Sequence, residues 1–432
     1  MTERLTVLVA GGGAREHALA WAIARSPLCE RVLLAPGNGG TDAPFGNLPV
    51  AADDVGGLVA AARAHGAGLV VIGPDAAVAA GLGDACRHQG IPVFGPTADA
   101  GRIESSKRFA KRLMEGAGIP TARWISGAGA ERDAVLGFIR DLGGRCVVKA
   151  DGLALGKGVV VCDTLDEATG AVDACLRDGR FGAAGDTVVV EERLEGPEVS
   201  VFALSDGRHV RMLVPACDYK RAHDGDRGPN TGGMGAYSPP AGVDVDALLE
   251  RALREVVEPA VDALANGGTP YTGCLFAGLM LTADGPRVLE FNARFGDPET
   301  QVILPLLAED PLQLLLDSAR GELQPGRAAL HPGAAVGVVV AAQGYPGDVR
   351  RGDAITGLDD LDPGVLCFQG GTARERDGDR LVTAGGRVLT VVAREATLDA
   401  ARARALDNAA RVRFTGAWHR SDIALTAAEV AG

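Results

Sequence analysis

The N-terminal part of the chain, up to residue 103, repeats one hydropathy pattern: a short apolar run, a glycine or proline, and then a helical stretch. The apolar runs are residues 5–10, 31–35, 69–72 and 91–94. After the first run, apolar residues recur at helical spacing over 14–25. This repetition predicts a parallel sheet with helices on both faces, and ligands of such sheets bind at the carboxyl ends of the strands.

The turn after the first run contains Gly11, Gly12 and Gly13. A dinucleotide fingerprint would need a glycine where Glu16 stands, and Asn38 follows the second run where an acid would bind a ribose hydroxyl. The pattern therefore disfavours nicotinamide binding and favours a phosphate site made of N–H groups at a helix N-terminus. A glycine turn that serves packing alone is the alternative.

A predicted helix over residues 105–116 begins with a lysine, Lys107. Cations in a first helical turn oppose the helix dipole unless an anion binds there, so Lys107 is a candidate phosphate ligand. The neighbouring Arg108, Lys111 and Arg112 fit a solvated basic face better than a ligand site.

Two predicted strands, 146–150 and 159–162, flank a loop with regularly spaced glycines. Lys149 lies in the first strand, and Gly156, Lys157 and Gly158 end the loop. Such a loop can fold over a polyphosphate. It is not a Walker A loop, because no helix follows it and no Ser or Thr follows the lysine. A mobile hairpin without a ligand is the alternative.

Two further segments carry polar residues suited to ligands. A strand over 187–191 ends in main chain that could contact an adenine edge, followed by acids that could accept from ribose hydroxyls or simply be surface charge. Residues 215–240 show no periodicity and read as a long loop, which inside a compact domain is usually functional. Its candidate substrate ligands are Asp218, Lys220, Arg221, Asn230 and Thr231.

A predicted strand over 287–291 ends in two oxygen-bearing side chains, Glu290 and Asn292. They are two residues apart and so share a face of the strand. Two protein oxygens completed by phosphates and water are a usual arrangement for Mg²⁺. Arg294, Asp297 and Glu299 follow in the same segment.

Composition narrows the classes of partner. The 432 residues indicate roughly three domains at about 150 residues each. The net charge of −13 and the 4% aromatic content argue against nucleic acid or an anionic membrane, and no apolar run is long enough to span a bilayer. We expect a cytoplasmic protein with small-molecule ligands, monomeric, with a dimer as the alternative. Only five of the 43 basic residues are lysines, so these five are expected where a compact ammonium is needed.

Together these motifs resemble the ATP-grasp superfamily, and within it the glycinamide ribonucleotide synthetase (phosphoribosylamine-glycine ligase) family. The strings that carry the resemblance are GGGAREHALAWA at 11, APGNGGT at 35, KADGLALGKGVVV at 149, GPNTGGMGAYSPP at 228, EFNARFGDPETQ at 290 and GYPGD at 344. They extend over nearly the whole chain. Asp75, Pro197, Cys217 and Tyr219 depart from the family's usual residues, and bear on substrate geometry rather than on the reaction.

The resemblance implies an α/β fold, α+β in part, with three domains. These are an N-terminal parallel α/β substrate domain over 1–103, an ATP-grasp domain over 104–325 with a mobile lid at about 123–191, and a small C-terminal domain over 328–432. The last fits a strand at 334–341, another at 385–393 and a helix at 398–411.

The resemblance also implies a reaction, ATP-dependent ligation of glycine to 5-phosphoribosylamine through a glycyl phosphate in purine biosynthesis, with Mg²⁺ or Mn²⁺. The implied catalytic residues are Arg294, Lys149 and Asp218, and the implied ATP ligands are Lys107, Lys149, Gly156, Lys157, Gly158, Glu191, Glu192, Leu194 and Glu198. The implied substrate ligands are Gly11, Gly12, Gly13, Asn38, Asp75, Asp218, Lys220, Asn230, Thr231, Gly232, Gly233, Arg294 and Asp297, with Glu290 and Asn292 on the metal. Another ATP-grasp carboxylate-amine ligase and a non-catalytic ATP sensor are the alternatives.

Overall fold

The computed structural model describes residues 4–153, 158–375 and 380–425. Its N-terminal part contains a parallel four-stranded sheet in the order β2-β1-β3-β4. The elements are β1 (Leu5–Gly11), α1 (Ala14–Ala24), β2 (Cys29–Pro36), α2 (Val55–Ala64), β3 (Ala67–Ile72), α3 (Asp75–Ala79), α4 (Leu82–His88) and β4 (Val93–Phe94). The predicted parallel sheet is confirmed.

The alternation of β1 explains why helices cover both faces of this sheet. Val7 and Val9 pack with Leu19 of α1, while Leu8 packs on the other face with Leu58 of α2. Each face of the strand thus buries its own set of aliphatic side chains. The carboxyl end of β1 and the N-terminus of α1 lie at the same edge, which is where the glycine turn stands.

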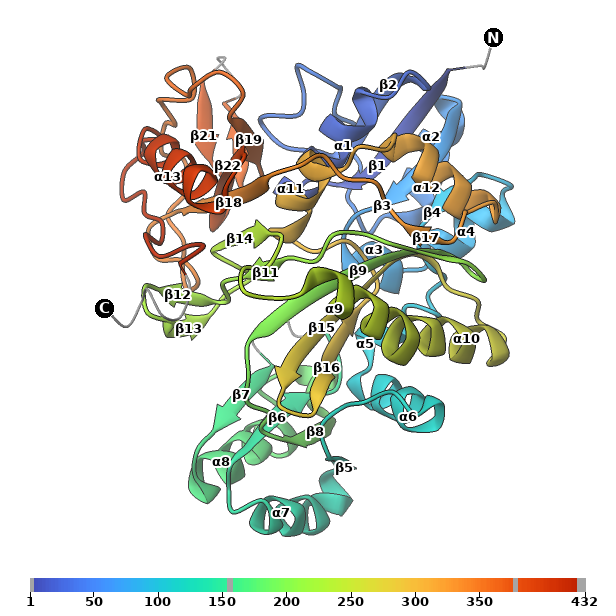
Figure 1. The fold of residues 1–432 in the computed structure, drawn as a ribbon, viewed down its shortest axis with the longest axis vertical. Coiled ribbons are helices and arrows are strands. Elements are labelled where there is room, and N and C mark those ends of the chain that lie inside the picture. The colour runs from blue at the N-terminus through green and yellow to red at the C-terminus, as the bar shows by residue number, and fades with distance from the viewer. Residues whose placement is uncertain (1–3, 154–157, 376–379, 426–432) are drawn as a thin grey trace.

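A smaller antiparallel sheet, in the order β5-β8-β6-β7, projects from the rest of the chain at the bottom of Figure 1. Its strands are β5 (Trp124–Ala128), β6 (Cys146–Ala150), β7 (Val159–Cys162) and β8 (Thr187–Glu192). Two helices, α7 (Arg132–Asp141) and α8 (Leu165–Leu176), share its core, and the 3-10 turns η1 (Gly129–Glu131) and η2 (Gly182–Gly185) complete it. This unit holds the predicted hairpin of 146–162.

The central sheet has the order β16-β15-β9-β10-β17. Its strands are β9 (Glu198–Asp206), β10 (Val210–Met212), β15 (Thr272–Thr282), β16 (Gly285–Asn292) and β17 (Gly326–Arg327). One face packs against a cluster that includes α6 (Lys107–Ala117), α9 (Val245–Ala252), the π-helical η3 (Leu253–Val257) and α10 (Glu258–Asn266). The short α5 (Arg102–Ser105) leads into α6.

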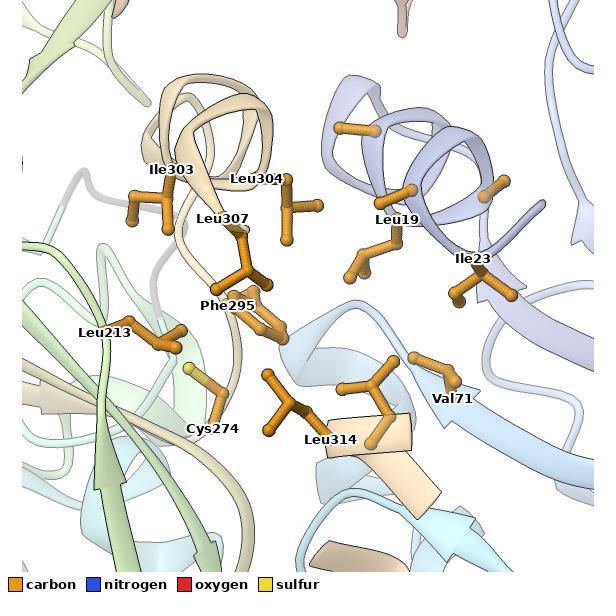
Figure 2. Packing of buried hydrophobic residues seen from close by; sticks show 14 of the residues in the cluster. Leu19, Ile23, Val71, Leu213, Cys274, Phe295, Ile303, Leu304, Leu307 and Leu314 are labelled. Atoms are coloured by element: carbon orange, nitrogen blue, oxygen red, sulfur yellow. The ribbon is translucent and has the colours of Figure 1, made fainter. Parts of the chain in front are cut away.

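The opposite face of the central sheet shares one hydrophobic core with the N-terminal sheet. Figure 2 shows this junction, where Leu19 and Ile23 of α1 lie near Phe295, Leu304 and Leu314. The last three come from the segment that contains α11 (Glu299–Ile303), η4 (Leu304–Leu306) and α12 (Pro311–Arg320). Because the two sheets share this core, they are fixed relative to each other around the carboxyl edge of β1.

The third large sheet has the order β11-β14-β18-β22-β19 and is covered by α13 (Leu398–Ala409). Its C-terminal strands are β18 (Ala334–Ala341), β19 (Leu366–Gln369) and β22 (Arg387–Glu395), beside a two-stranded ribbon of β20 (Thr372–Arg374) and β21 (Leu381–Thr383). The strands and helix predicted for this region are present. Among the described residues, no helix is both long and apolar enough to cross a membrane.

The interpretation of residues 215–240 as one long loop is wrong. The segment forms four short strands, β11 (Cys217–Asp218), β12 (Arg221–His223), β13 (Arg227–Asn230) and β14 (Gly235–Ser238). Strands of two to four residues leave too few alternating positions to show a period of two. Two of them, β11 and β14, join the sheet made by the C-terminal strands.

Candidate active site

The site is centred on the end of β16, where the pairing with β15 is irregular. Glu290 pairs with Gly278 and Val288 with Leu279, so Leu289 is an extra residue, a β-bulge. The bulge allows Val288 and Phe291, three positions apart, both to pack into the core. Glu290 is only half buried, between these two core residues.

Four cationic side chains surround the Glu290 carboxylate. Burial raises the pKa of Glu290, but the charges of Lys220, Lys149, Lys107 and Arg294 outweigh burial and hold the pKa below its usual value. The four come from separate elements, namely the segment after β11, β6, α6 and the loop after β16. Within the described residues none of them is within ion-pair distance of Glu290, so the carboxylate faces positive charge without a direct partner.

Arg294 is held by a glutamate that the sequence did not single out. Its Nη2 lies 2.9 Å from Oε1 of Glu104, on α5, and donates a 3.0 Å hydrogen bond to Oδ1 of Asn292. The other Glu104 oxygen accepts from the N–H of Ala293 at 2.8 Å. Burial raises the pKa of Glu104, and the positive charge of Arg294 lowers it by a smaller amount. The predicted metal ligand Asn292 and the predicted catalytic Arg294 therefore lie together.

Lys107 stands at the first position of α6, as predicted. Ser106 caps the helix, because its hydroxyl accepts a hydrogen bond from the N–H of Phe109. Asp151, directly after β6, accepts a 2.7 Å hydrogen bond from the N–H of Arg108. The Lys107 ammonium donates to the carbonyl of Gly152 at 3.4 Å. Burial lowers the pKa of Lys107. The start of α6 is thus tied to the strand that carries Lys149, through an aspartate that sequence reasoning missed.

Lys149 is buried and ion-paired with Glu191 at 2.7 Å. Its ammonium also donates to the bulged carbonyl of Leu289 at 3.0 Å. Lys111 lies 2.8 Å from the second Glu191 oxygen, with its side chain only 2% exposed. The assignment of Lys111 to a solvated basic face is therefore wrong, because this lysine points inward from α6. Burial lowers its pKa to about 8, although Glu191 opposes the shift.

The residues after Glu191 connect β8 to β9 and contain the other acids proposed as ATP ligands. Glu192 accepts from the N–H of Arg123 at 2.9 Å and pairs with its guanidinium at 2.7 Å; these contacts, against burial, lower its pKa. Leu194 is half buried, and Glu198 at the start of β9 pairs with Lys220 at 2.7 Å. Gly158 is buried, while Gly156 and Lys157 lie outside the described residues.

Strand β11 supplies Asp218, whose charge also interacts with that of Glu290. Burial raises the pKa of Asp218, and Lys220 opposes this shift. Glu299, at the start of α11, is 3% exposed, and burial followed by repulsion from Asp218 raises its pKa to about 7. Thr231 uses its hydroxyl within the turn, donating to the Lys220 carbonyl at 2.9 Å. Asn230 accepts from Arg221 at 3.5 Å.

A cavity of about 180 Å³ lies at the N-terminus of α1, against strands of the C-terminal sheet. Its lining comprises Gly13, Ala14, Asp297, Gly370, Gly371, Arg387, Leu389 and Thr390. Arg387 pairs with Asp297 at 3.1 Å and donates to the carbonyl of Gly232 at 2.7 Å. Sequence reasoning found Gly13 and Asp297 but missed the C-terminal residues, whose signal was the glycine pairs 370–371 and 385–386 before Arg387.

The remaining predicted substrate residues are engaged within the protein. The N–H of Gly13 donates to Glu16 at 2.6 Å, and Asn38 uses its amide on the carbonyls of Gly12 and Gln369. A side chain at Gly12 would meet the Gly37 carbonyl at 2.3 Å, so close approach of two backbones requires this glycine. Asp75 is half buried at the start of α3, and Gly233 is buried where a side chain would meet Pro298. Gly11 has a φ of 120°, a backbone conformation that favours glycine.

The donor set fits a metal that phosphates complete. Within the described part of the chain, no group of three or more His, Cys, Asp and Glu could hold a metal by itself. Glu290 and Asn292 offer a carboxylate and an amide oxygen, the hard donors that Mg²⁺ and Mn²⁺ accept, beside cations that would bind phosphate. These residues fit a metal that is shared with a polyphosphate.

A parallel N-terminal sheet, a projecting antiparallel unit and a cation-lined central sheet define the ATP-grasp class. A crystal structure of the biotin carboxylase domain of 2-oxoglutarate carboxylase from Hydrogenobacter thermophilus shares this fold, with a TM-score of 0.72 over 97% of this chain and 92% of that one, at 15% identity. Within the class, the chain belongs to the phosphoribosylglycinamide synthetase family. The family's N, ATP-grasp and C domain models match residues 5–104, 105–300 and 335–426.

Individual relatives agree over almost their full lengths. The phosphoribosylamine-glycine ligase of Allochromatium vinosum is 48% identical, with 97% of this chain and 98% of that protein covered. The ligase of Streptomyces coelicolor is 49% identical, with 98% and 100% covered. The crystal structure of the Thermotoga maritima phosphoribosylamine-glycine ligase superposes with a TM-score of 0.85 at 35% identity, covering 97% of this chain and all of that one.

Proposed function

We propose that this chain is an ATP-dependent ligase that joins glycine to 5-phosphoribosylamine, giving glycinamide ribonucleotide, ADP and phosphate in purine biosynthesis. The family match supports the reaction. The observation that carries it is the convergence of Lys107, Lys149, Lys220 and Arg294 on Glu290, because a phosphoryl transfer needs concentrated positive charge beside a metal ligand.

The chemistry proceeds in two steps. The glycine carboxylate attacks the γ-phosphorus of ATP, which forms glycyl phosphate and releases ADP. The amine of phosphoribosylamine then attacks the glycyl carbonyl carbon, the C–O bond to phosphate breaks, and the amine loses a proton as the amide forms. The amine is already nucleophilic, so the protein's work is positioning and charge neutralisation.

The ATP side of this proposal uses residues around β16. Lys107, Lys149 and Arg294 neutralise phosphate oxygens, and Glu290 with Asn292 would hold Mg²⁺ or Mn²⁺. The metal, when bound, supplies Lewis-acid polarisation of the phosphates. Further ATP ligands are Glu191, Glu192, Leu194, Glu198 and the loop of Gly156, Lys157 and Gly158.

The substrate side uses β11, the segment that follows it, and the N-terminal turn beside the cavity. Glycine and the sugar are assigned to Asp218, Lys220 and the segment of Asn230, Thr231, Gly232 and Gly233, with Asp297 as a further substrate ligand. The aminosugar phosphate is assigned to Gly11, Gly12 and Gly13 with Asn38 and Asp75, and Arg387 of the cavity adds a cation on that side. We propose the same three-part division, 1–103, 104–325 and 328–432, with a lid over about 123–191.

A phosphate-release assay tests the function. With MgATP, glycine and freshly prepared phosphoribosylamine we expect stoichiometric ADP, phosphate and glycinamide ribonucleotide, and loss of the product when any one substrate is omitted. Replacing phosphoribosylamine with hydroxylamine should trap glycyl phosphate as glycine hydroxamate and release phosphate. Turnover with a different carboxylate or amine, but none with this pair, would favour another ATP-grasp ligase; nucleotide binding without turnover would indicate a sensor.

A further inference from the structure

Lys111 is a fully buried lysine that the proposed chemistry does not use. Its side chain is 2% exposed, and its ammonium lies 2.8 Å from Oε2 of Glu191. The ammonium also donates a 2.7 Å hydrogen bond to Oγ1 of Thr121. A buried ammonium is costly unless it is paired and hydrogen-bonded, and both conditions are met here. Its neighbour Arg112, one position along α6, is exposed.

The contacts of Lys111 belong to a network that connects the antiparallel unit to the central sheet. The Thr121 hydroxyl donates to the carbonyl of Val288 at 2.6 Å. On the other side of Glu191, Lys149 donates to the carbonyl of Leu289 at 3.0 Å. The network thus begins and ends on consecutive carbonyls of β16, immediately before Glu290.

The distribution of charge in this network determines what Lys149 can offer a ligand. Glu191 presents one oxygen to each lysine, Oε2 to Lys111 and Oε1 to Lys149 at 2.7 Å. The three groups together carry one net positive charge. Without Lys111, Glu191 and Lys149 would neutralise each other, and a phosphate near Lys149 would meet a neutral pair instead of a cation.

Hydrogen-bond capacity leads to the same conclusion. An ammonium has three N–H donors, and Lys149 uses one of them on the Leu289 carbonyl, while its ion pair with Glu191 leaves Oε1 of that carboxylate without a hydrogen bond. Donors of Lys149 therefore remain for a ligand while Lys111 holds the other oxygen of Glu191 and keeps this carboxylate from taking them. We propose that Lys111 is a positioning residue for nucleotide binding, which acts through Glu191 to keep the charge and one donor of Lys149 available to a phosphate. This inference rests on the proposed assignment of Lys149 to the ATP phosphates.

The primary test compares Lys111→Met with Arg112→Met, which removes an exposed cation from the same helix. The Kd for MgATP is measured by calorimetry without glycine or phosphoribosylamine, and the melting temperature is recorded. We expect the Kd to rise about tenfold or more in Lys111→Met, within the usual range for coupled neighbours, and to remain unchanged in Arg112→Met. Steady-state KM values for glycine should stay near those of the wild type. An unchanged Kd in Lys111→Met would overturn the proposal.

A second comparison separates positioning from simple structural support. Because Lys111 acts through Glu191, Lys111→Met should have little effect on the Kd when it is introduced into Glu191→Gln, where no carboxylate remains to be shared. The double variant also leaves no unpaired buried carboxylate, so it provides the test if the single variant fails to fold. A further loss of ATP affinity in the double variant would contradict the proposal. These binding measurements require no turnover, so failure of the ligase assay would be a separate result.

Discussion

At the scale of single residues, the site depends on acids whose surroundings shift their pKa values in opposite directions. Cations hold the pKa of Glu290 down, while burial raises that of Glu299 to about 7. Groups with perturbed pKa values gather at functional sites because ligand charges will later share the same space. The two glutamates thus differ in role: one is suited to a metal and the other changes protonation near neutral pH.

Glu290→Gln keeps the size of the side chain and removes its charge. We expect kcat to fall by about 100-fold or more, because one of the two protein oxygens proposed for the metal loses its charge. The measurement is kcat across a Mg²⁺ titration, with Glu250→Gln on the exposed face of α9 as the matched control. Near-normal turnover at saturating Mg²⁺ would show that Glu290 is not a metal ligand.

Glu299→Gln should change how stability depends on pH. The folded protein holds the Glu299 proton up to a pKa of about 7, whereas the ordinary value is 4.5, so the folded state binds more protons between these values. The contribution of this group to stability is therefore lost as pH rises through that window, by about 2–3 kcal/mol. Urea unfolding at several pH values in the window should show a shallower decline for the variant. Parallel declines in both proteins would refute the assignment.

At the scale of elements, the regular parts were predictable and the irregular ones were not. Helix α1 and the strands of the N-terminal sheet follow from periodicity, because each buries a whole face. Lys111 was misplaced because a lysine in an amphipathic helix is normally solvated, and only the fold brings Glu191 to it. Glu104 was missed for the same reason, since Arg294 lies far from it in sequence.

The N-terminus of α1 offers a test of the aminosugar site. Ala14 lines the cavity beside Gly13, whereas a side chain at Gly12 would collide with the Gly37 carbonyl, so Ala14 is the better position to alter. Ala14→Glu should raise the KM for phosphoribosylamine about tenfold or more by repelling its phosphate, with the KM for ATP unchanged. Ala14→Gln matches its size without the charge and should have a much smaller effect. Equal effects of the two variants would indicate crowding alone.

At the scale of the whole molecule, the N-terminal and central sheets are joined by one core. Leu19 of α1 packs there with Phe202 of β9 and Leu314 of α12. The two sheets therefore support the candidate site from both sides as one body. The antiparallel unit of β5 to β8 has its own core instead.

Leu19→Ala should destabilise both sheets together. Leu19 is 1% exposed, and truncating a buried leucine costs about 2–5 kcal/mol. We expect calorimetry to show one shifted transition for the N-terminal and central sheets, with tryptic fragments from both appearing at the same rate. Selective early cleavage of the N-terminal sheet would show instead that the two sheets unfold independently.

The β11-β14-β18-β22-β19 sheet combines strands from two distant parts of the chain, residues 217–238 and 334–395. This arrangement has a consequence for synthesis on the ribosome. Strand β14 pairs with β18, which is translated only after α9, α10, β15 and β16 have been made. Until β18 emerges, the nascent chain has Asp218 on a strand, and Lys220 shortly after it, without the rest of their sheet. The glycine side of the site is therefore completed near the end of translation, and truncation before β18 should yield a protein with Lys107, Lys149 and Arg294 in place and no competent pocket for the acyl donor.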